Sequence, residues 1–317
     1  MQVAVLFPGQ GSQYAGMAGP WLRHPASRDV IERASDVLGW DVAAQSGDDD
    51  ALKRTDVVQP AVFACDVAAF EVLRAEGVRP AAAAGHSLGE YAALVAAGTL
   101  SLDDALRTLD VRAKAMQRAS DENPGGMTAL IGMSPQDVRE LCDVAGRGDV
   151  LQVANENGPR QVVVSGSLAA IERAEELCRS RGWRSIRLKV AGAFHSPLME
   201  PAVQPVRDAI SRVPFRQPAF PVVPNASGKP TTQPLVLRDL LGRHIASPVR
   251  WEATMRAMVA MGVTRFLEAG PGDVLGKLAR RAAEGSTVAS VGSPDEARQA
   301  AQASGDAASV DASPEGA

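Results

Sequence analysis

The sequence has few cysteines, no strongly basic stretch and no long apolar run, and each absence excludes a class of protein. A net charge of −4 without a basic cluster argues against a nucleic-acid partner. No apolar run approaches bilayer-spanning length and strand-like residues begin at Val3, so we expect no signal peptide, no membrane partner and a cytoplasmic location. The three cysteines form no Cys-x-x-Cys pair, so we expect buried thiols rather than disulfides or a zinc site: Cys65, Cys142 and Cys178.

The most informative segment that is present is Gly85-His86-Ser87-Leu88-Gly89, which has the Gly-x-Ser-x-Gly form of a nucleophile elbow. In an elbow, a serine sits on a sharp turn between a strand and a helix, and the glycines permit backbone that a Cβ atom would block. Residues 90–97 form the predicted helix, whereas residues 81–84 would be the strand although alanine favours helix. The pattern predicts Ser87 as a nucleophile; an ordinary glycine-flanked turn is the alternative.

Apolar runs that alternate with helical patterns predict a doubly wound α/β sheet around this elbow. The run at residues 3–7 ends at Pro8-Gly9, as a buried parallel strand does. Residues 102–119 form a predicted helix, with Ser101 as its N-cap.

Between residues 124 and 192 the predicted order changes to βαββαβ, which is the order of a ferredoxin-like unit inserted into the larger sheet. We therefore assign residues 1–123 and 193–292 to a discontinuous large domain and residues 124–192 to a small subdomain. Residues 293–317 contain one large apolar residue and are predicted to form a disordered tail.

Histidine is scarce, which narrows the choice of a general base for the serine, since the chain has only four. His24 falls in a helical stretch, His86 should point away from the hydroxyl, and His244 follows a helical segment as a surface or helix-end residue. His195 follows the last strand of the insert, where the chain re-enters the main domain, and such junctions line clefts. We predict that His195 is the base.

The loop after the first strand matches neither phosphate-binding motif. Tyr14 stands where a dinucleotide fingerprint needs glycine, and Met17 stands where a P-loop needs lysine. Such a loop beside an elbow can still donate a backbone N–H to an oxyanion hole. The two candidate donors are the N–H groups of Gln10 and Leu88.

Two basic features have open interpretations. Arg112 lies at the edge of the apolar stripe of the predicted helix, so it is either a cover for the core or a partly buried anion ligand. A basic cluster at the end of the insert is either a solvated face or a surface that steers an acidic partner: Arg179, Arg181, Arg184, Arg187 and Lys189.

Together, these motifs resemble those of the malonyl-CoA:acyl-carrier-protein transacylases, both the fatty-acid type and the discrete trans-acting acyltransferases of polyketide synthesis. The resemblance is collinear and covers nearly everything before the predicted tail. Several motifs that occur in the same order identify a family far more specifically than a single motif does. Its segments are Phe7–Gln13, Gly85–Glu90, Arg112, Asn157–Pro159, Gln161–Gly166, Gly192–Ser196, Ser247–Trp251 and Gly270–Gly272.

The resemblance implies a hydrolase-like parallel-sheet α/β domain with a ferredoxin-like insert, and a site in the cleft between them. It implies that Ser87 takes the acyl group, that His195 is the base, and that Arg112 pairs with the malonyl carboxylate.

The resemblance also implies roles for residues around this centre. Gln10 and Leu88 would form the oxyanion hole, and Gln59 would lie near the acyl pocket. Phe194 would limit the space beside the malonyl α-carbon. The backbone carbonyl of Arg250 would orient the histidine.

The implied reaction is ping-pong transfer of a malonyl group from malonyl-CoA to the phosphopantetheine thiol of an acyl carrier protein, without a cofactor or metal. Two alternatives are a thioesterase or serine hydrolase on the same scaffold and a non-catalytic subunit that docks a carrier protein. The hydrolase would gain nothing from Arg112, and the docking subunit would leave Ser87 and His195 idle.

Overall fold

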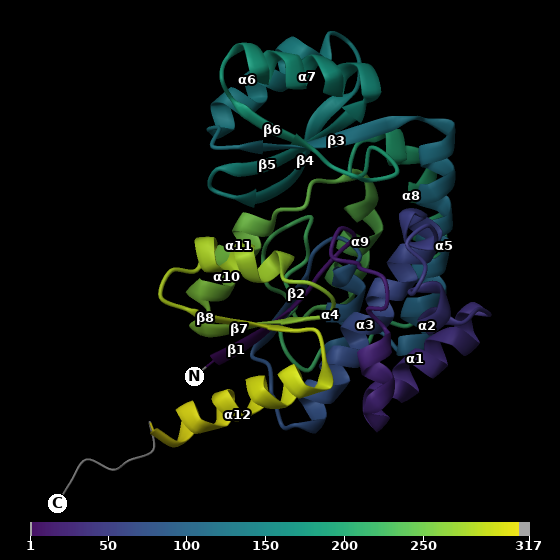
Figure 1. The fold of residues 1–317 in the computed structure, drawn as a ribbon, viewed down its shortest axis with the longest axis vertical. Coiled ribbons are helices and arrows are strands. Elements are labelled where there is room, and N and C mark those ends of the chain that lie inside the picture. The colour runs from purple at the N-terminus through teal and green to yellow at the C-terminus, as the bar shows by residue number, and fades with distance from the viewer. Residues whose placement is uncertain (1, 311–317) are drawn as a thin grey trace, which may run out of the picture.

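A four-stranded parallel sheet forms the centre of the larger part of the molecule, in the order β2-β1-β7-β8 (Figure 1). The computed structural model describes the backbone of residues 2–310 and the side chains of residues 2–304. Strand β2 consists of three alanines and a glycine, and its burial beside β1 overrides the low strand propensity of alanine. The strands are β1 (Gln2–Phe7), β2 (Ala82–Gly85), β7 (Val263–Ala269) and β8 (Thr287–Val291).

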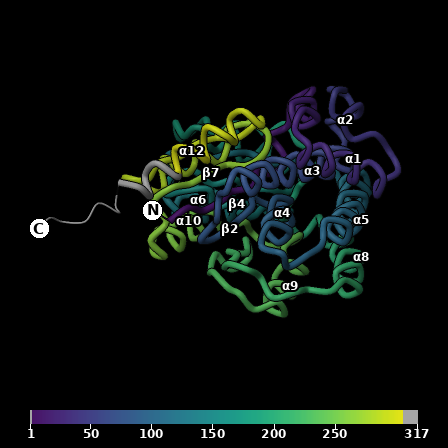
Figure 2. The backbone as a smooth tube through the Cα atoms, turned by 90° about the horizontal axis from the view of Figure 1, so that it is seen from below, coloured from purple at the N-terminus to yellow at the C-terminus, as the bar shows by residue number. Residues whose placement is uncertain are grey.

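Helices cover both faces of this sheet, which explains why residues 3–7 are apolar without interruption. Val3, Val5 and Phe7 belong to an apolar cluster that includes residues of α1, α3 and α5, whereas Ala4 and Leu6 belong to a second cluster with residues of α10 and α11. Figure 2 shows α1, α3 and α5 side by side. The helices of this part are α1 (Pro25–Leu38), α2 (Val42–Gln45), α3 (Thr55–Ala75), α4 (Gly89–Ala96), α5 (Leu102–Glu122), α8 (Glu200–Ser211), α9 (Pro234–Arg243), α10 (Trp251–Ala260), α11 (Val274–Ala282) and α12 (Pro294–Val310). Short 3-10 helices accompany them at Gly19–Arg23, Ala51–Lys53, Pro197–Met199 and His244–Ala246.

The smaller part is an antiparallel sheet in the order β4-β5-β3-β6, with two helices on the face that is turned away from the main sheet (Figure 1). Its βαββαβ connectivity and strand order are those of a ferredoxin-like unit, so the predicted fold class is confirmed. The helices bury a separate apolar cluster against the sheet. The elements are β3 (Gly125–Ile131), α6 (Pro135–Gly146), β4 (Leu151–Gly158), β5 (Gln161–Ser167), α7 (Leu168–Ser180) and β6 (Arg184–Arg187).

The prediction of a disordered tail from residue 293 is wrong for the part that the structure describes, because α12 occupies residues 294–310. Its alanines are good helix formers, and Ala297 and Ala300 are buried against the main core. Arg265 fastens the helix by donating a hydrogen bond to the carbonyl of Ala300 (3.2 Å). Residues 311–317 lie outside the described residues. Within residues 2–310, no helix combines the length and apolar character needed to cross a bilayer.

Candidate active site

The elbow has the strand-turn-helix form that its sequence predicts. Strand β2 ends at Gly85 and α4 begins at Gly89, while Ser87 between them takes a φ of +53° in the left-handed region. A Cβ atom on Gly85 would lie 1.9 Å from the carbonyl carbon of Gly89, and one on Gly89 would lie 2.2 Å from the carbonyl oxygen of Phe7. Both glycines are therefore required for the close approach of three backbone segments.

Ser87 and His195 lie within hydrogen-bond distance, with 2.8 Å between Oγ and Nε2. His195 is nearly fully buried and takes a φ of +58°. Its other ring nitrogen, Nδ1, lies 3.1 Å from the carbonyl oxygens of both His244 and Ser247. Because a carbonyl accepts only, Nδ1 carries the proton, and Nε2 is left as the acceptor that faces the serine hydroxyl.

The prediction that the carbonyl of Arg250 orients this histidine is wrong. Arg250 is the N-cap of α10, and its carbonyl accepts from the backbone N–H of Thr254 (3.0 Å) as the first bond of that helix. The carbonyls of His244 and Ser247, which are the first residue and the C-cap of the preceding 3-10 helix, take its place. His244 does end a helix, as expected, but it is buried and not at the surface, with its ring centroid 5.0 Å from that of His195.

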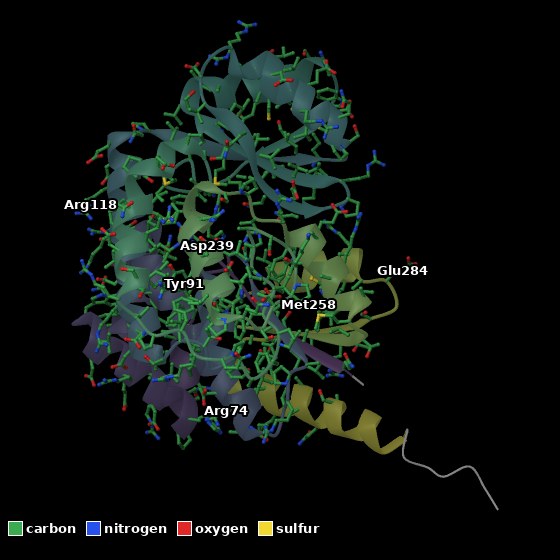
Figure 3. The ribbon with its side chains drawn as sticks, turned by 180° about the vertical axis from the view of Figure 1, so that it is seen from behind. Arg74, Tyr91, Arg118, Asp239, Met258 and Glu284 are labelled. Carbon is green, nitrogen blue, oxygen red and sulfur yellow. The ribbon has the colours of Figure 1, made fainter. Side chains whose placement is uncertain are left out.

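Arg112 reaches the same point from the interior of α5. Its side chain is 1% exposed, which excludes a surface cover, whereas Arg118 on the same helix is exposed (Figure 3). Its Nη2 donates to Ser87 Oγ (3.0 Å) and its Nη1 donates to Gln59 Oε1. Its guanidinium also lies 6.0 Å from the ring centroid of buried Tyr91. Within residues 2–304, no carboxylate forms a salt bridge with Arg112, so this buried cation has no paired counter-charge, and an anionic ligand could supply one.

Two backbone N–H groups beside the serine are free to bind an oxyanion. The loop that holds Gln10 packs against the elbow, since a Cβ atom on Gly9 would lie 2.4 Å from the carbonyl oxygen of His86. Neither the N–H of Gln10 nor that of Leu88 donates to any acceptor in the described part of the chain. The N–H of Ser87 itself is occupied by the side-chain oxygen of Asn225 (2.8 Å).

Ser87, His195 and Gln10 line a cavity of about 60 Å³ to which the smaller part contributes one wall. The cavity is small, so it suits a short acyl group. Gln59 and Phe194, both predicted from the resemblance, are buried in its lining. The lining residues are Gln10, Gln59, His86, Ser87, Met116, Met127, Asn155, Leu188, Val190, Phe194 and His195.

Burial controls the protonation of the site. Desolvation and, to a smaller extent, the positive charge of Arg112 lower the pKa of His195 to about 3, although the two carbonyl contacts oppose the shift. The imidazole is therefore neutral at neutral pH and able to accept a proton. Desolvation raises the pKa of the Glu90 carboxyl to about 7, although hydrogen bonds from Asn225 and the charge of Arg112 lower it.

Two residues near the centre are absent from the sequence predictions. Asn225 follows the apolar run at residues 221–223, and that run is the signal that could have revealed a strand ending at the site. Gln152 lies on β4 and donates to the carbonyl of His195 (2.9 Å), with no signal in the sequence. Within residues 2–304, no group of three or more His, Cys, Asp or Glu side chains is arranged to hold a metal ion.

Comparison with known proteins gives a consistent result. Residues 5–312 match the acyl transferase domain family. The chain is 38% identical to the malonyl CoA-acyl carrier protein transacylase of Escherichia coli K12, over 92% of this chain and 96% of that one. It superposes on the acyl-carrier-protein S-malonyltransferase of Bartonella henselae with a TM-score of 0.92 and 37% identity, covering 96% and 100% of the two chains. It also matches a malonyl-transacylase solved in complex with its type II PKS acyl-carrier protein, with a TM-score of 0.91 and 35% identity, covering 96% and 100%.

Proposed function

The chain belongs to the acyl transferase domain family, and from that premise we propose that it moves a malonyl group from malonyl-CoA to the thiol of an acyl carrier protein through an ester on Ser87. One observation carries the proposal. The hydroxyl of Ser87 lies between the neutral base His195 (2.8 Å) and the buried cation Arg112 (3.0 Å).

In the first half-reaction, Ser87 Oγ attacks the thioester carbonyl while His195 Nε2 takes its proton. The oxyanion that forms accepts hydrogen bonds from the N–H groups of Gln10 and Leu88. When the intermediate collapses, the C–S bond breaks and the CoA sulfur leaves with the proton from His195. The second half-reaction reverses these steps: the phosphopantetheine thiol gives its proton to His195, its sulfur attacks the ester, and Ser87 recovers the proton.

Arg112 supplies the preference for a malonyl group. In a malonyl-serine ester, only the ester carbonyl carbon and one methylene carbon separate the serine oxygen from the free carboxylate. The carboxylate is therefore within reach of a guanidinium that donates to that oxygen. A planar guanidinium can hold the carboxylate through two charge-assisted hydrogen bonds. A serine hydrolase would use Ser87 and His195 but would have no use for this buried cation.

We also propose that the enzyme acts in the cytoplasm, which cell fractionation tests.

The intact mass of the protein after incubation with malonyl-CoA tests the proposal. We expect one malonyl adduct in the wild type and none in Ser87→Ala. Ser27→Ala, at a buried serine in α1 that donates to the Trp21 carbonyl, should keep the adduct. An adduct retained in Ser87→Ala would refute the assignment of the nucleophile.

Added holo-acyl carrier protein then separates transferase from hydrolase. A transferase moves the malonyl group onto the carrier, whereas a hydrolase releases free malonate whether or not the carrier is present. A docking subunit forms no adduct at all.

A further inference from the structure

Ser87 and His195 share an unusual backbone conformation. They are two of only three non-glycine residues with positive φ in the described part of the chain, at +53° and +58°. The left-handed region disfavours side chains with a Cβ atom and persists only where neighbouring groups enforce it. The groups that enforce it here lie far away in the sequence.

Asn225 holds the turn at Ser87. Its Oδ1 accepts from the N–H of Ser87 (2.8 Å) and its Nδ2 donates to the carbonyl of Gly85 (2.6 Å), so that one side chain bridges both ends of the elbow. Because it occupies the N–H of Ser87, it leaves the next N–H, that of Leu88, as the free donor beside the hydroxyl.

Asn225 is itself rigidly held, and its side chain is completely buried. Residues 221–223 extend the main sheet past β2, with the N–H of Val223 donating to the carbonyl of Ala83 (3.0 Å). The backbone N–H of Asn225 donates to Glu90 Oε2 (2.9 Å), and its carbonyl accepts from the N–H of Arg250 (3.0 Å). Sheet, helix α4 and the start of α10 thus all determine where its carboxamide lies.

Gln152 holds the turn at His195 in the same way. It projects from β4 of the smaller part, and its Nε2 donates to the carbonyl of His195 (2.9 Å). Strand β4 is in turn tied to the larger part through Val249, whose N–H donates to Ala154 (2.8 Å) and whose carbonyl accepts from Glu156 (2.8 Å). The base is therefore fastened to a different sheet from the one that carries the nucleophile.

We propose that Asn225 and Gln152 are positioning residues for the acyl transfer: each carboxamide locks one of the two left-handed residues, Ser87 or His195, so that Oγ and Nε2 meet. This inference rests on the proposed roles of Ser87 and His195. Without the locks, the two peptide planes are free to rotate toward ordinary conformations, which separates the hydroxyl from the imidazole.

Single-turnover acylation by malonyl-CoA tests this, because it reports the rate and the acylated fraction separately. Gln152→Met keeps the length of the side chain and removes its donor, and Asn225→Ala removes the bridge. We expect the rate of acylation to fall about ten- to hundredfold in each, as for a small misplacement of reacting groups. The folded fraction that becomes acylated should still approach one adduct per chain.

Two matched controls remove similar bonds elsewhere. Gln217→Met deletes a donor to the Thr232 carbonyl (2.9 Å), and Asn123→Ala deletes one to the Ala119 carbonyl (3.3 Å). Both should keep the wild-type rate.

A merely structural role predicts a lower acylated fraction with an unchanged rate constant, and that result would overturn the inference. An equal loss of rate in the controls would also overturn it. If the wild type itself forms no adduct that maps to Ser87, the proposed function fails instead, so the two failures are distinguishable.

Discussion

Arg112 is the residue that separates a malonyl transferase from a generic serine acyl enzyme. Because it is buried without a carboxylate partner, its replacement in Arg112→Ala should remove the reason to prefer a charged acyl group. Loss of a charge-assisted pair in such a site costs roughly 2–5 kcal/mol, or about thirtyfold to several thousandfold in kcat/KM for malonyl-CoA. Acetyl-CoA should be spared or used better, because the guanidinium no longer has to be desolvated.

The ratio of kcat/KM for malonyl-CoA to that for acetyl-CoA is the measurement. Arg118→Ala, an exposed arginine on the same helix, should leave the ratio unchanged and serves as the control. A ratio that stays constant in Arg112→Ala would remove the carboxylate role.

His195 should give the free enzyme an unusual pH profile. Burial and the nearby charge of Arg112 lower its pKa to about 3, so its neutral form persists below pH 6.5, where an ordinary histidine gains a proton. The rate at which a neutral sulfonyl fluoride modifies Ser87 should therefore stay flat from pH 7 to about 5 and fall only in more acidic solution. A midpoint near 6.5 would contradict the burial argument.

The residues that the structure brings together were mostly predictable, and the reason is local. A glycine-flanked serine after a strand and a histidine at a domain junction each carry a signal in their immediate neighbours. Gln152 carries no such signal, and the apolar run at residues 221–223 indicates only a strand before Asn225, because the contacts of these two side chains bridge 43 and 138 residues. The error at Arg250 has the same origin: the position of a carbonyl depends on where α10 begins.

At the scale of elements, the elbow depends on close contact between β1, β2 and α4. A Cβ atom on Gly89 would lie 2.2 Å from the Phe7 carbonyl oxygen and 2.7 Å from that of Pro8, both backbone atoms that cannot move cheaply. Gly89→Ala should therefore lower the free energy of unfolding by about 1–3 kcal/mol or more, despite the helix preference of alanine. Urea unfolding measures the change. Gly19→Ala, where a Cβ atom meets nothing within 4 Å, should change the free energy of unfolding by much less, and equal stability of the two variants would contradict the packing argument.

Element order was more predictable than element burial. The βαββαβ insert follows from local alternation, since each strand and helix there has its own apolar pattern. Helix α12 was missed because its buried face consists of alanines such as Ala297, which composition does not distinguish from a solvated tail. The short strand before Asn225 was missed because it extends an edge only through one bridge to Ala83.

At the scale of the whole molecule, the net charge of this chain is −4, so it would repel an acidic carrier protein at long range unless a basic surface steers that partner. The basic cluster at the end of the insert is largely neutralised within the fold. Arg179, Arg181 and Arg187 pair with Glu176, Glu140 and Glu175. Within the described part of the chain, Arg184 and Lys189 of that cluster form no salt bridge. Lys189 is exposed between Leu188 and Val190, which line the cavity at Ser87.

These two free cations should therefore steer the carrier, whereas the paired arginines should not. Arg184→Glu with Lys189→Glu should raise the KM for the carrier about tenfold at low ionic strength, with KM for malonyl-CoA little changed. Arg179→Glu with Arg181→Glu changes the net charge by the same amount, from −4 to −8 in each case, because two +1 groups become −1. If long-range repulsion from the whole molecule governed docking, both double variants would raise KM equally. The effect of the Arg184 and Lys189 substitutions on KM should fade as added salt shortens the screening length to about 8 Å. A KM that neither double variant changes at low salt would place the docking surface elsewhere.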